Sequence, residues 1–229
     1  MYDLFFCKRI LLATAVVSIH STLNMTQPHP SNSPLNQQPT LGEALPRRGN
    51  RYSQQLAQAI LARLGWRIEG EIANLPKMVL IGAPHTSNWD LILTIGAMFA
   101  LGVRFSWVAK HTIFRWPLGP LLRWLGGIGI NRQSSKGFVE KMVAEIQSRE
   151  QILLALMPEG TRSKVKEWRS GFYHIANQAK VPICLVIFDY GRKILRLGPT
   201  ISTTGDYATD LPHIQSFYAD ATGYNPTEQ

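Results

Sequence analysis

Residues 78–90 read Met-Val-Leu-Ile-Gly-Ala-Pro-His-Thr-Ser-Asn-Trp-Asp, and they decide both the fold and the place to look for chemistry. The first six are continuously apolar, which predicts a strand buried on both faces. Helical spacing begins at Trp89, so the residues between form a turn that joins a strand to a helix. On one continuous helix, His85 and Asp90 would point about 140° apart, because each residue advances about 100°. The two side chains can therefore meet only if His85 lies in the turn and Asp90 in the first helical turn.

An imidazole and a carboxylate that meet at the mouth of a strand can act as a general base and the group that orients it. The same residues also suit a structural role, because an acid three residues after Ser87 is a common helix-capping device. The spacing alone leaves both interpretations open.

The rest of the chain repeats this alternation of strand and helix. Strands are expected over residues 104–109, 152–157 and 181–188, and helices over 89–101, 136–148 and 171–179. A half-exposed strand is expected over 66–72, and an edge strand over 194–197. Strands without polar alternation, separated by helices, predict a single α/β domain with a mostly parallel central sheet covered by helices.

The N-terminal part is expected to be a leader and linker over residues 1–50, ahead of a domain spanning 51–222. Residues 25–51 are rich in Pro, Ser, Asn and Gln, a composition that predicts disorder. The largely apolar run 10–19 follows Lys8 and Arg9, as in a secretory signal, and is too short to span a bilayer. A start codon assigned too far upstream of Met25 and a short membrane-associating leader both remain open.

A short amphipathic helix is expected to lead into the domain over residues 53–64. Its apolar residues recur at helical spacing, and Gly65 follows as a stop signal. These apolar residues are Leu56, Ile60, Leu61 and Leu64.

The formal charge of +9 indicates an anionic partner, namely nucleic acid, an anionic membrane or a phosphorylated substrate. Residues 101–170 contain twelve Lys or Arg and five Glu, so much of the excess is local. The two cysteines, Cys7 and Cys184, suggest no disulfide framework and fit a reducing compartment. Cys184 falls in an apolar run, where a buried thiol is the usual interpretation.

A second polar constellation, Pro158-Glu159-Gly160-Thr161-Arg162-Ser163, follows the strand expected at 152–157. The planar fork of Arg162 suits phosphate, and Thr161 with backbone amides beside Gly160 can complete an anion cradle. A polar turn with a surface salt bridge is the alternative.

The glycines of residues 126–132, Gly-Gly-Ile-Gly-Ile-Asn-Arg, superficially suggest a dinucleotide-binding turn. We reject this interpretation, because Arg132 stands where the motif G-x-G-x-x-G requires its third glycine. In addition, no long buried strand precedes the glycines. A short strand that delivers Arg132 to the same end of the sheet is more economical.

Residues 105–124 interleave aromatic and basic side chains, as expected at the interface of an anionic bilayer. A core helix with a basic rim and a site for single-stranded nucleic acid are the alternatives. The side chains expected to contact the membrane are Phe114, Trp116, Trp124, Lys110, Arg115 and Arg123.

The sequence lacks the motifs that several other enzyme classes require. The sequence contains no G-x-S-x-G motif, no Walker A loop, no H-E-x-x-H motif and no CxxC pair. It offers no support for a hydrolase, an NTPase or a zinc enzyme.

Taken together, these stretches resemble the glycerolipid acyltransferase family, of the 1-acylglycerol-3-phosphate or lysophospholipid type. The family's four ordered blocks correspond here to His85–Asp90, residues 127–132, Pro158–Ser163 and Val181-Pro182-Ile183. The resemblance covers residues 66–200 and implies a glycerol-3-phosphate acyltransferase-like fold.

The resemblance implies transfer of an acyl group from an acyl-CoA or acyl-carrier-protein thioester to a lipid hydroxyl, without a metal or bound cofactor. It implies that His85 is the catalytic base and Asp90 its partner. It also implies that the following residues bind substrate: Ser87, Asn88, Arg132, Glu159, Gly160, Thr161 and Arg162.

We therefore expect a peripheral or monotopic enzyme on the cytoplasmic face of the inner membrane, acting on a lysophospholipid such as 1-acylglycerol-3-phosphate and not on nucleic acid. A lyso-ornithine lipid or a lipid A precursor is an alternative acceptor. A non-catalytic basic protein that binds membranes or nucleic acid is the alternative from another class.

Overall fold

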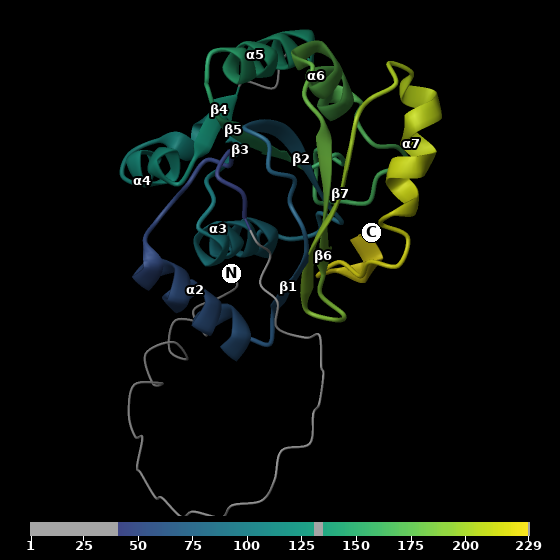
Figure 1. Cartoon of the computed structure of the whole chain (residues 1–229). Helices are drawn as coiled ribbons and strands as arrows, with labels where there is room; N and C mark the ends of the chain where they lie inside the picture. Colours follow the sequence, from purple (N-terminus) through teal and green to yellow (C-terminus); the bar gives the residue numbers. More distant parts are fainter. Residues whose placement is uncertain (1–40, 131–134, 229) are drawn as a thin grey trace, which may run out of the picture. The chain divides into compact units, whose positions relative to one another are not determined.

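A seven-stranded sheet organises the part of the chain that the structure, a computed structural model, describes: residues 41–130 and 135–228 (Figure 1). The strand order is β1-β7-β6-β2-β5-β3-β4. The strands are β1 (Arg67–Gly70), β2 (Lys77–Ala83), β3 (Phe105–Lys110), β4 (Gly127–Ile130), β5 (Ile152–Leu156), β6 (Ile183–Asp189) and β7 (Ile194–Ile201).

The helices connect these strands and cover them. They are α2 (Arg51–Arg63), α3 (Trp89–Leu101), α4 (Gly119–Trp124), α5 (Ser135–Gln147), α6 (Gly171–Ala179) and α7 (Tyr207–Ser216), with 3-10 turns η1 (His111–Phe114) and η2 (Pro226–Glu228). The expected α/β fold with a mostly parallel central sheet is confirmed.

The five strands β6, β2, β5, β3 and β4 are mutually parallel, so their carboxyl ends share one edge of the sheet. Strand β7 returns antiparallel to β6, and β1 pairs parallel to β7. The prediction of an edge strand at 194–197 was therefore wrong. These residues pair on both sides, and the short β1 takes the edge position.

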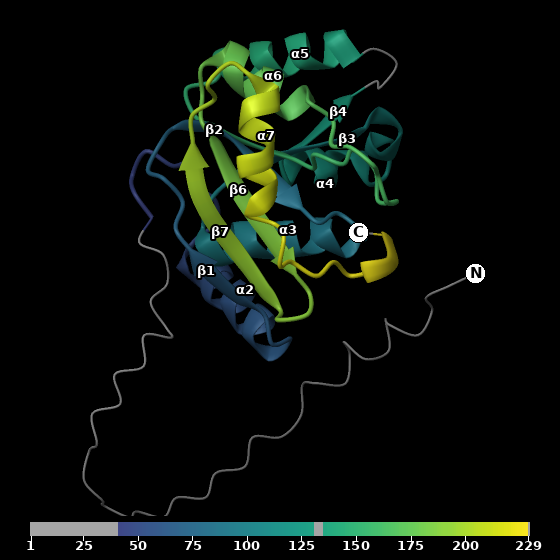
Figure 2. The ribbon, with the colours of Figure 1, turned by 90° about the vertical axis from the view of Figure 1, so that its right-hand side faces the viewer.

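Helices cover both faces of the sheet (Figures 1 and 2). Helices α5, α6 and α7 pack on the face that presents Ile81 and Leu154, whereas α2 and α3 pack on the face that presents Met78 and Leu153. Successive strand residues point to opposite faces, so two covered faces leave no place for polar alternation. This explains the continuously apolar strands. Cys184 of β6 is buried as expected, and burial raises the pKa of its thiol to about 11; Cys7 lies outside the described residues.

The predicted disorder up to Arg51 was wrong for residues 41–50. Leu45 is buried in the core cluster on the α2 and α3 side of the sheet, and Arg47 forms a β-bridge with Val103. The backbone groups of Pro46 and Arg48 bond to the chain around Gly102, so the segment has both apolar and hydrogen-bonding partners that composition does not reveal. The leader interpretations for residues 1–40 lie outside the described residues.

Helix α2 confirms the predicted amphipathic helix and starts at a capping box between Asn50 and Ser53. Its apolar residues divide between two surroundings. Leu61 packs into the core, whereas Leu56, Ile60 and Leu64 are at least half exposed.

Candidate active site

The catalytic pair expected from the sequence is assembled at the carboxyl end of β2. His85 lies in the turn after the strand, and Asp90 lies in the first turn of α3. The Nδ1 atom of His85 is 2.8 Å from Oδ2 of Asp90, with the imidazole one-fifth exposed and the carboxylate fully buried. An imidazole held in this way presents its other nitrogen, Nε2, to a reactant.

The predicted capping by Ser87 with an acid at N3 was wrong, because the N-cap of α3 is Asn88, which makes no side-chain cap hydrogen bond. The Ser87 hydroxyl instead accepts a hydrogen bond from the N–H of Trp89. The Oδ2 atom of Asp90 accepts a hydrogen bond from the backbone N–H of Ser87, at 3.1 Å. The carboxylate therefore fixes the turn that carries His85 as well as the ring itself.

Tyr190 is a member of this site that the sequence analysis missed. It follows β6, and its hydroxyl donates to Oδ1 of Asp90 at 2.6 Å. Burial, followed by the hydrogen bond to Asp90, raises the pKa of the Tyr190 hydroxyl far above its usual value. The available signal was its position directly after a buried strand, at the edge where His85 also lies.

Glu159 approaches His85 from the carboxyl end of β5. Its Oε1 atom accepts the backbone N–H of His85 at 3.0 Å, and its Oε2 atom is buried without a hydrogen-bond partner among the described residues. Burial is the main cause that raises the pKa of this carboxyl. Gly160 follows with φ of 67°, and a Cβ there would meet Cδ of Arg169 at 2.7 Å, which explains the glycine.

A polar cavity of about 350 Å³ brings together several residues expected to bind substrate. Arg162 donates from its Nη1 to Oδ1 of Asn88 at 2.7 Å, which links the β5 turn to the His85 turn. The cavity is lined by Thr86, Ser87, Asn88, Thr161, Arg162, Ser163 and Asn225. Arg132, expected to join this site, lies outside the described residues.

A second, more apolar cavity of about 250 Å³ adjoins the same turn. His85 and Glu159 are among its polar lining residues, and Thr86 lines both cavities. The second cavity is lined by Ala83, Pro84, His85, Thr86, Glu159, Val165, Trp168, Gln215, Tyr218 and Ala219. The candidate base therefore lines the more apolar cavity, and the residues directly after it line the polar one.

The C-terminal tail, for which the sequence predicted no role, borders the site. Asn225 makes two hydrogen bonds to Thr86, from its backbone N–H to Oγ1 and from Nδ2 to the carbonyl oxygen. Tyr224 packs edge-on against Tyr190, with ring centroids 5.2 Å apart. Both contacts join segments more than 30 residues apart, which no local pattern could predict.

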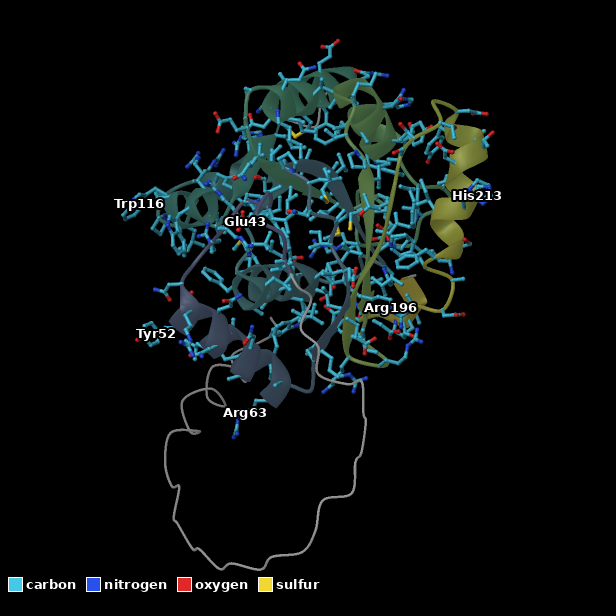
Figure 3. The ribbon with its side chains drawn as sticks, viewed as in Figure 1. Glu43, Tyr52, Arg63, Trp116, Arg196 and His213 are labelled. Carbon is cyan, nitrogen blue, oxygen red and sulfur yellow. The ribbon has the colours of Figure 1, made fainter. Side chains whose placement is uncertain are left out.

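Most of the side chains expected to meet a membrane are exposed, and one is not. Trp116 is 87% and Trp124 61% exposed, and Figure 3 shows Trp116 pointing away from the sheet. The basic residues Lys110, Arg115 and Arg123 are exposed as well. The prediction for Phe114 was wrong, because this ring is buried and stacks on Trp107 with centroids 5.7 Å apart.

Within 41–130 and 135–228, no three His, Cys, Asp or Glu side chains are grouped so that they could hold a metal ion. No helix in the same ranges has both the length and the apolar character needed to cross a membrane.

Comparison with known proteins shows a similar fold and the family of this chain. A solved structure with a similar fold is the crystal structure of the 1-acyl-sn-glycerophosphate (LPA) acyltransferase PlsC from Thermotoga maritima. It matches with a TM-score of 0.51 and 16% sequence identity, over 76% of this chain and 81% of that chain, which shows the fold alone. No curated protein sequence matches. The model of a family described as Acyltransferase matches residues 67–189, more than half of the chain, and so this protein belongs to the acyltransferase family.

Proposed function

We propose that this acyltransferase moves a fatty acyl group from an acyl-CoA or acyl-carrier-protein thioester to the hydroxyl of an anionic lysophospholipid such as 1-acylglycerol-3-phosphate. The observation that carries the proposal is the His85–Asp90 pair, 2.8 Å apart, on a turn whose residues line both a cavity that contains Arg162 and a more apolar one. Membership in the acyltransferase family favours this reaction over the non-catalytic alternative.

The geometry suits direct transfer. With its Nδ1–H donated to Asp90, His85 carries a lone pair on Nε2 and can take the proton of the acceptor hydroxyl. The hydroxyl oxygen attacks the thioester carbonyl carbon, the C–S bond breaks, and the imidazolium returns the proton to the leaving thiolate. An ester and a free thiol result, and no acyl-enzyme is needed.

One cavity suits the phosphate of the acceptor, and the other suits the alkyl part of the acyl donor. In the polar cavity, Arg162 offers a planar fork for the phosphate of the acceptor, and Asn88 holds that fork in place. The resemblance adds Arg132 and Thr161 to this role. In the other cavity, the rings of Trp168 and Tyr218 suit the alkyl part of the thioester.

A membrane-docking face would bring an insoluble acceptor to this site. We define the docking face as the exposed apolar side chains of α2 and of residues 113–124: Tyr52, Leu56, Ile60, Leu64, Ile113, Trp116, Leu118, Leu121 and Trp124. Figure 3 shows Tyr52 and Trp116 pointing outward on the same side. An exposed apolar patch among Arg and Lys residues suits an anionic bilayer, which we place at the cytoplasmic face of the inner membrane.

Arg48 joins the two parts of the docking face. Its guanidinium lies 4.1 Å from the ring centroid of Trp124 and donates to the carbonyl oxygen of that residue at 2.8 Å. Because Arg48 stands two residues before the cap of α2, it holds α4 beside the start of that helix.

The proposal is tested by offering purified protein 1-acylglycerol-3-phosphate and a long-chain acyl-CoA or acyl-carrier protein in mixed micelles. We expect His85→Ala to lower kcat about a hundred- to ten-thousandfold, because a positioned general base contributes about this much. His213→Ala, an exposed histidine on the outer side of α7, is the matched control. Full transfer by a folded His85→Ala variant would overturn the proposal.

The acceptor is identified by supplying a mixed pool of lysolipids and analysing the products by mass spectrometry. We expect phosphatidate to dominate. An acylated ornithine lipid or lipid A precursor in its place would keep the reaction and reassign the acceptor.

A further inference from the structure

Both carboxylate oxygens of Asp90 are hydrogen-bonded, one within its own turn and the other to a residue distant in the chain. Its Oδ2 atom faces His85 and the backbone N–H of Ser87, which belong to the same turn. Its Oδ1 atom accepts a hydrogen bond from the hydroxyl of Tyr190, which is 100 residues away in the chain. Tyr190 is the first residue beyond the segment that the family model matches, so membership in the family does not assign it a role.

We propose that Tyr190 is a positioning residue for the acyl transfer, which acts through Asp90 on His85. This inference rests on the proposed function. The hydroxyl fixes the rotation of the carboxylate so that Oδ2 faces the imidazole, and it favours the ionised form of Asp90.

Two ring contacts and one backbone hydrogen bond hold Tyr190 in place, as a positioning role requires. Trp66 packs edge-on against it with centroids 5.0 Å apart, and Tyr224 does so at 5.2 Å. Its backbone N–H donates to the carbonyl oxygen of Thr222 at 2.8 Å. The hydroxyl therefore reaches Asp90 with its ring already immobilised, so little conformational entropy is lost in the bond.

Packing alone does not account for the hydroxyl. A phenylalanine would make the same ring contacts with Trp66 and Tyr224, whereas the oxygen adds a 2.6 Å bond to a carboxylate with no exposed surface. A buried carboxylate depends on such donors to remain ionised. Only an ionised Asp90 can stabilise the imidazolium that forms when His85 takes the proton.

The test is Tyr190→Phe in the full chain, assayed with 1-acylglycerol-3-phosphate and a long-chain acyl-CoA or acyl-carrier protein. We expect kcat to fall about ten- to a hundredfold, the usual effect of losing a hydrogen bond to a charged group. The KM values for both substrates should change less than about twofold, because Tyr190 lines neither cavity.

The pH profile separates positioning from a general structural role. Without the hydroxyl, the negative charge on Asp90 loses one hydrogen-bond donor, and the acid limb of the kcat profile should move to higher pH. His213→Ala, the exposed control on α7 that lines neither cavity, should leave kcat and the profile unchanged.

Two results would overturn the inference while His85→Ala remains inactive. One is a Tyr190→Phe variant with wild-type kcat and pH profile, and the other is a loss confined to KM. If His85→Ala is active, the proposed function itself fails, which is a different outcome. Should Tyr190→Phe not fold, proton NMR of the wild type still decides, because a Tyr190 hydroxyl bonded to Asp90 must exchange slowly with solvent and a rapidly exchanging one contradicts the inference.

Discussion

The site around His85 and the docking face differ in burial: the site is buried and hydrogen-bonded, and the docking face is exposed and apolar. At the site, a fully buried carboxylate is fixed by bonds of 2.6 and 2.8 Å to Tyr190 and His85. On the docking face, side chains such as Trp116 and Leu56 are more than half exposed. Proton transfer depends on atomic positions, whereas adsorption to a lipid surface depends on apolar area and net charge. Changes at the site should therefore alter kcat or acceptor recognition, and changes on the docking face should alter only membrane binding.

The largest effect that would sharpen this contrast is expected at Arg162. We expect Arg162→Ala to raise KM for 1-acylglycerol-3-phosphate about ten- to a hundredfold, because a bond from a cation to phosphate is lost. Because the proposal places the acceptor's phosphate at Arg162, the effect should persist with a short-chain acceptor that is soluble in water. Steady-state kinetics with each substrate varied in turn measures this.

Arg162→Lys is the matched variant, because it keeps the charge and loses the planar fork. Its KM should lie between those of the wild type and Arg162→Ala. A rise confined to KM of the acyl donor would refute the assignment of this residue to the acceptor.

The sequence predicted the order of strands and helices because their apolar periodicity is a local property. Helix α3 and strand β2 appear where residues 78–101 indicated them. What depended on distant partners was not predictable. Strand β1 takes the edge position because it pairs with β7, and Leu45 is buried by core residues distant in the chain.

The same division holds at the site. His85 and Asp90 are five residues apart, so their meeting followed from a turn and a helix start. Tyr190 and Asn225 join the site through the sheet and the C-terminal tail, from 100 and 139 residues away. Phe114 was placed at the membrane because aromatic rings in a basic stretch look alike in sequence, whether they face outward or stack on Trp107.

A smaller effect is expected on the docking face. Trp116→Ala should weaken binding to anionic vesicles about tenfold, because a large ring that would enter the interface is removed. With substrates that are soluble in water, its kcat and KM should equal those of the wild type. Cosedimentation with vesicles and a soluble assay measure the two parts.

Leu75→Ala is the control for Trp116→Ala, since Leu75 is a partly exposed apolar residue near the amino end of β2, opposite the end that carries His85. It should leave vesicle binding unchanged. If Trp116→Ala lowered kcat in the soluble assay, the separation of the two regions would be broken.

The smallest effect concerns the stability of the site. Burial raises the pKa of Glu159 above its usual 4.5, so the native state keeps this proton at a pH where the unfolded chain has released it. The wild type therefore loses stability as the pH rises from about 4.5 through the raised pKa. Glu159→Gln has no such proton to lose and should become the more stable protein over this window, while its transfer activity falls. Urea unfolding of both proteins at pH 4, 6 and 8 measures the difference, and parallel curves would contradict it. Because the apolar side chains of the docking face, such as Trp116, have no proton that titrates in this range, of the two regions only the site should show this exchange of stability for function.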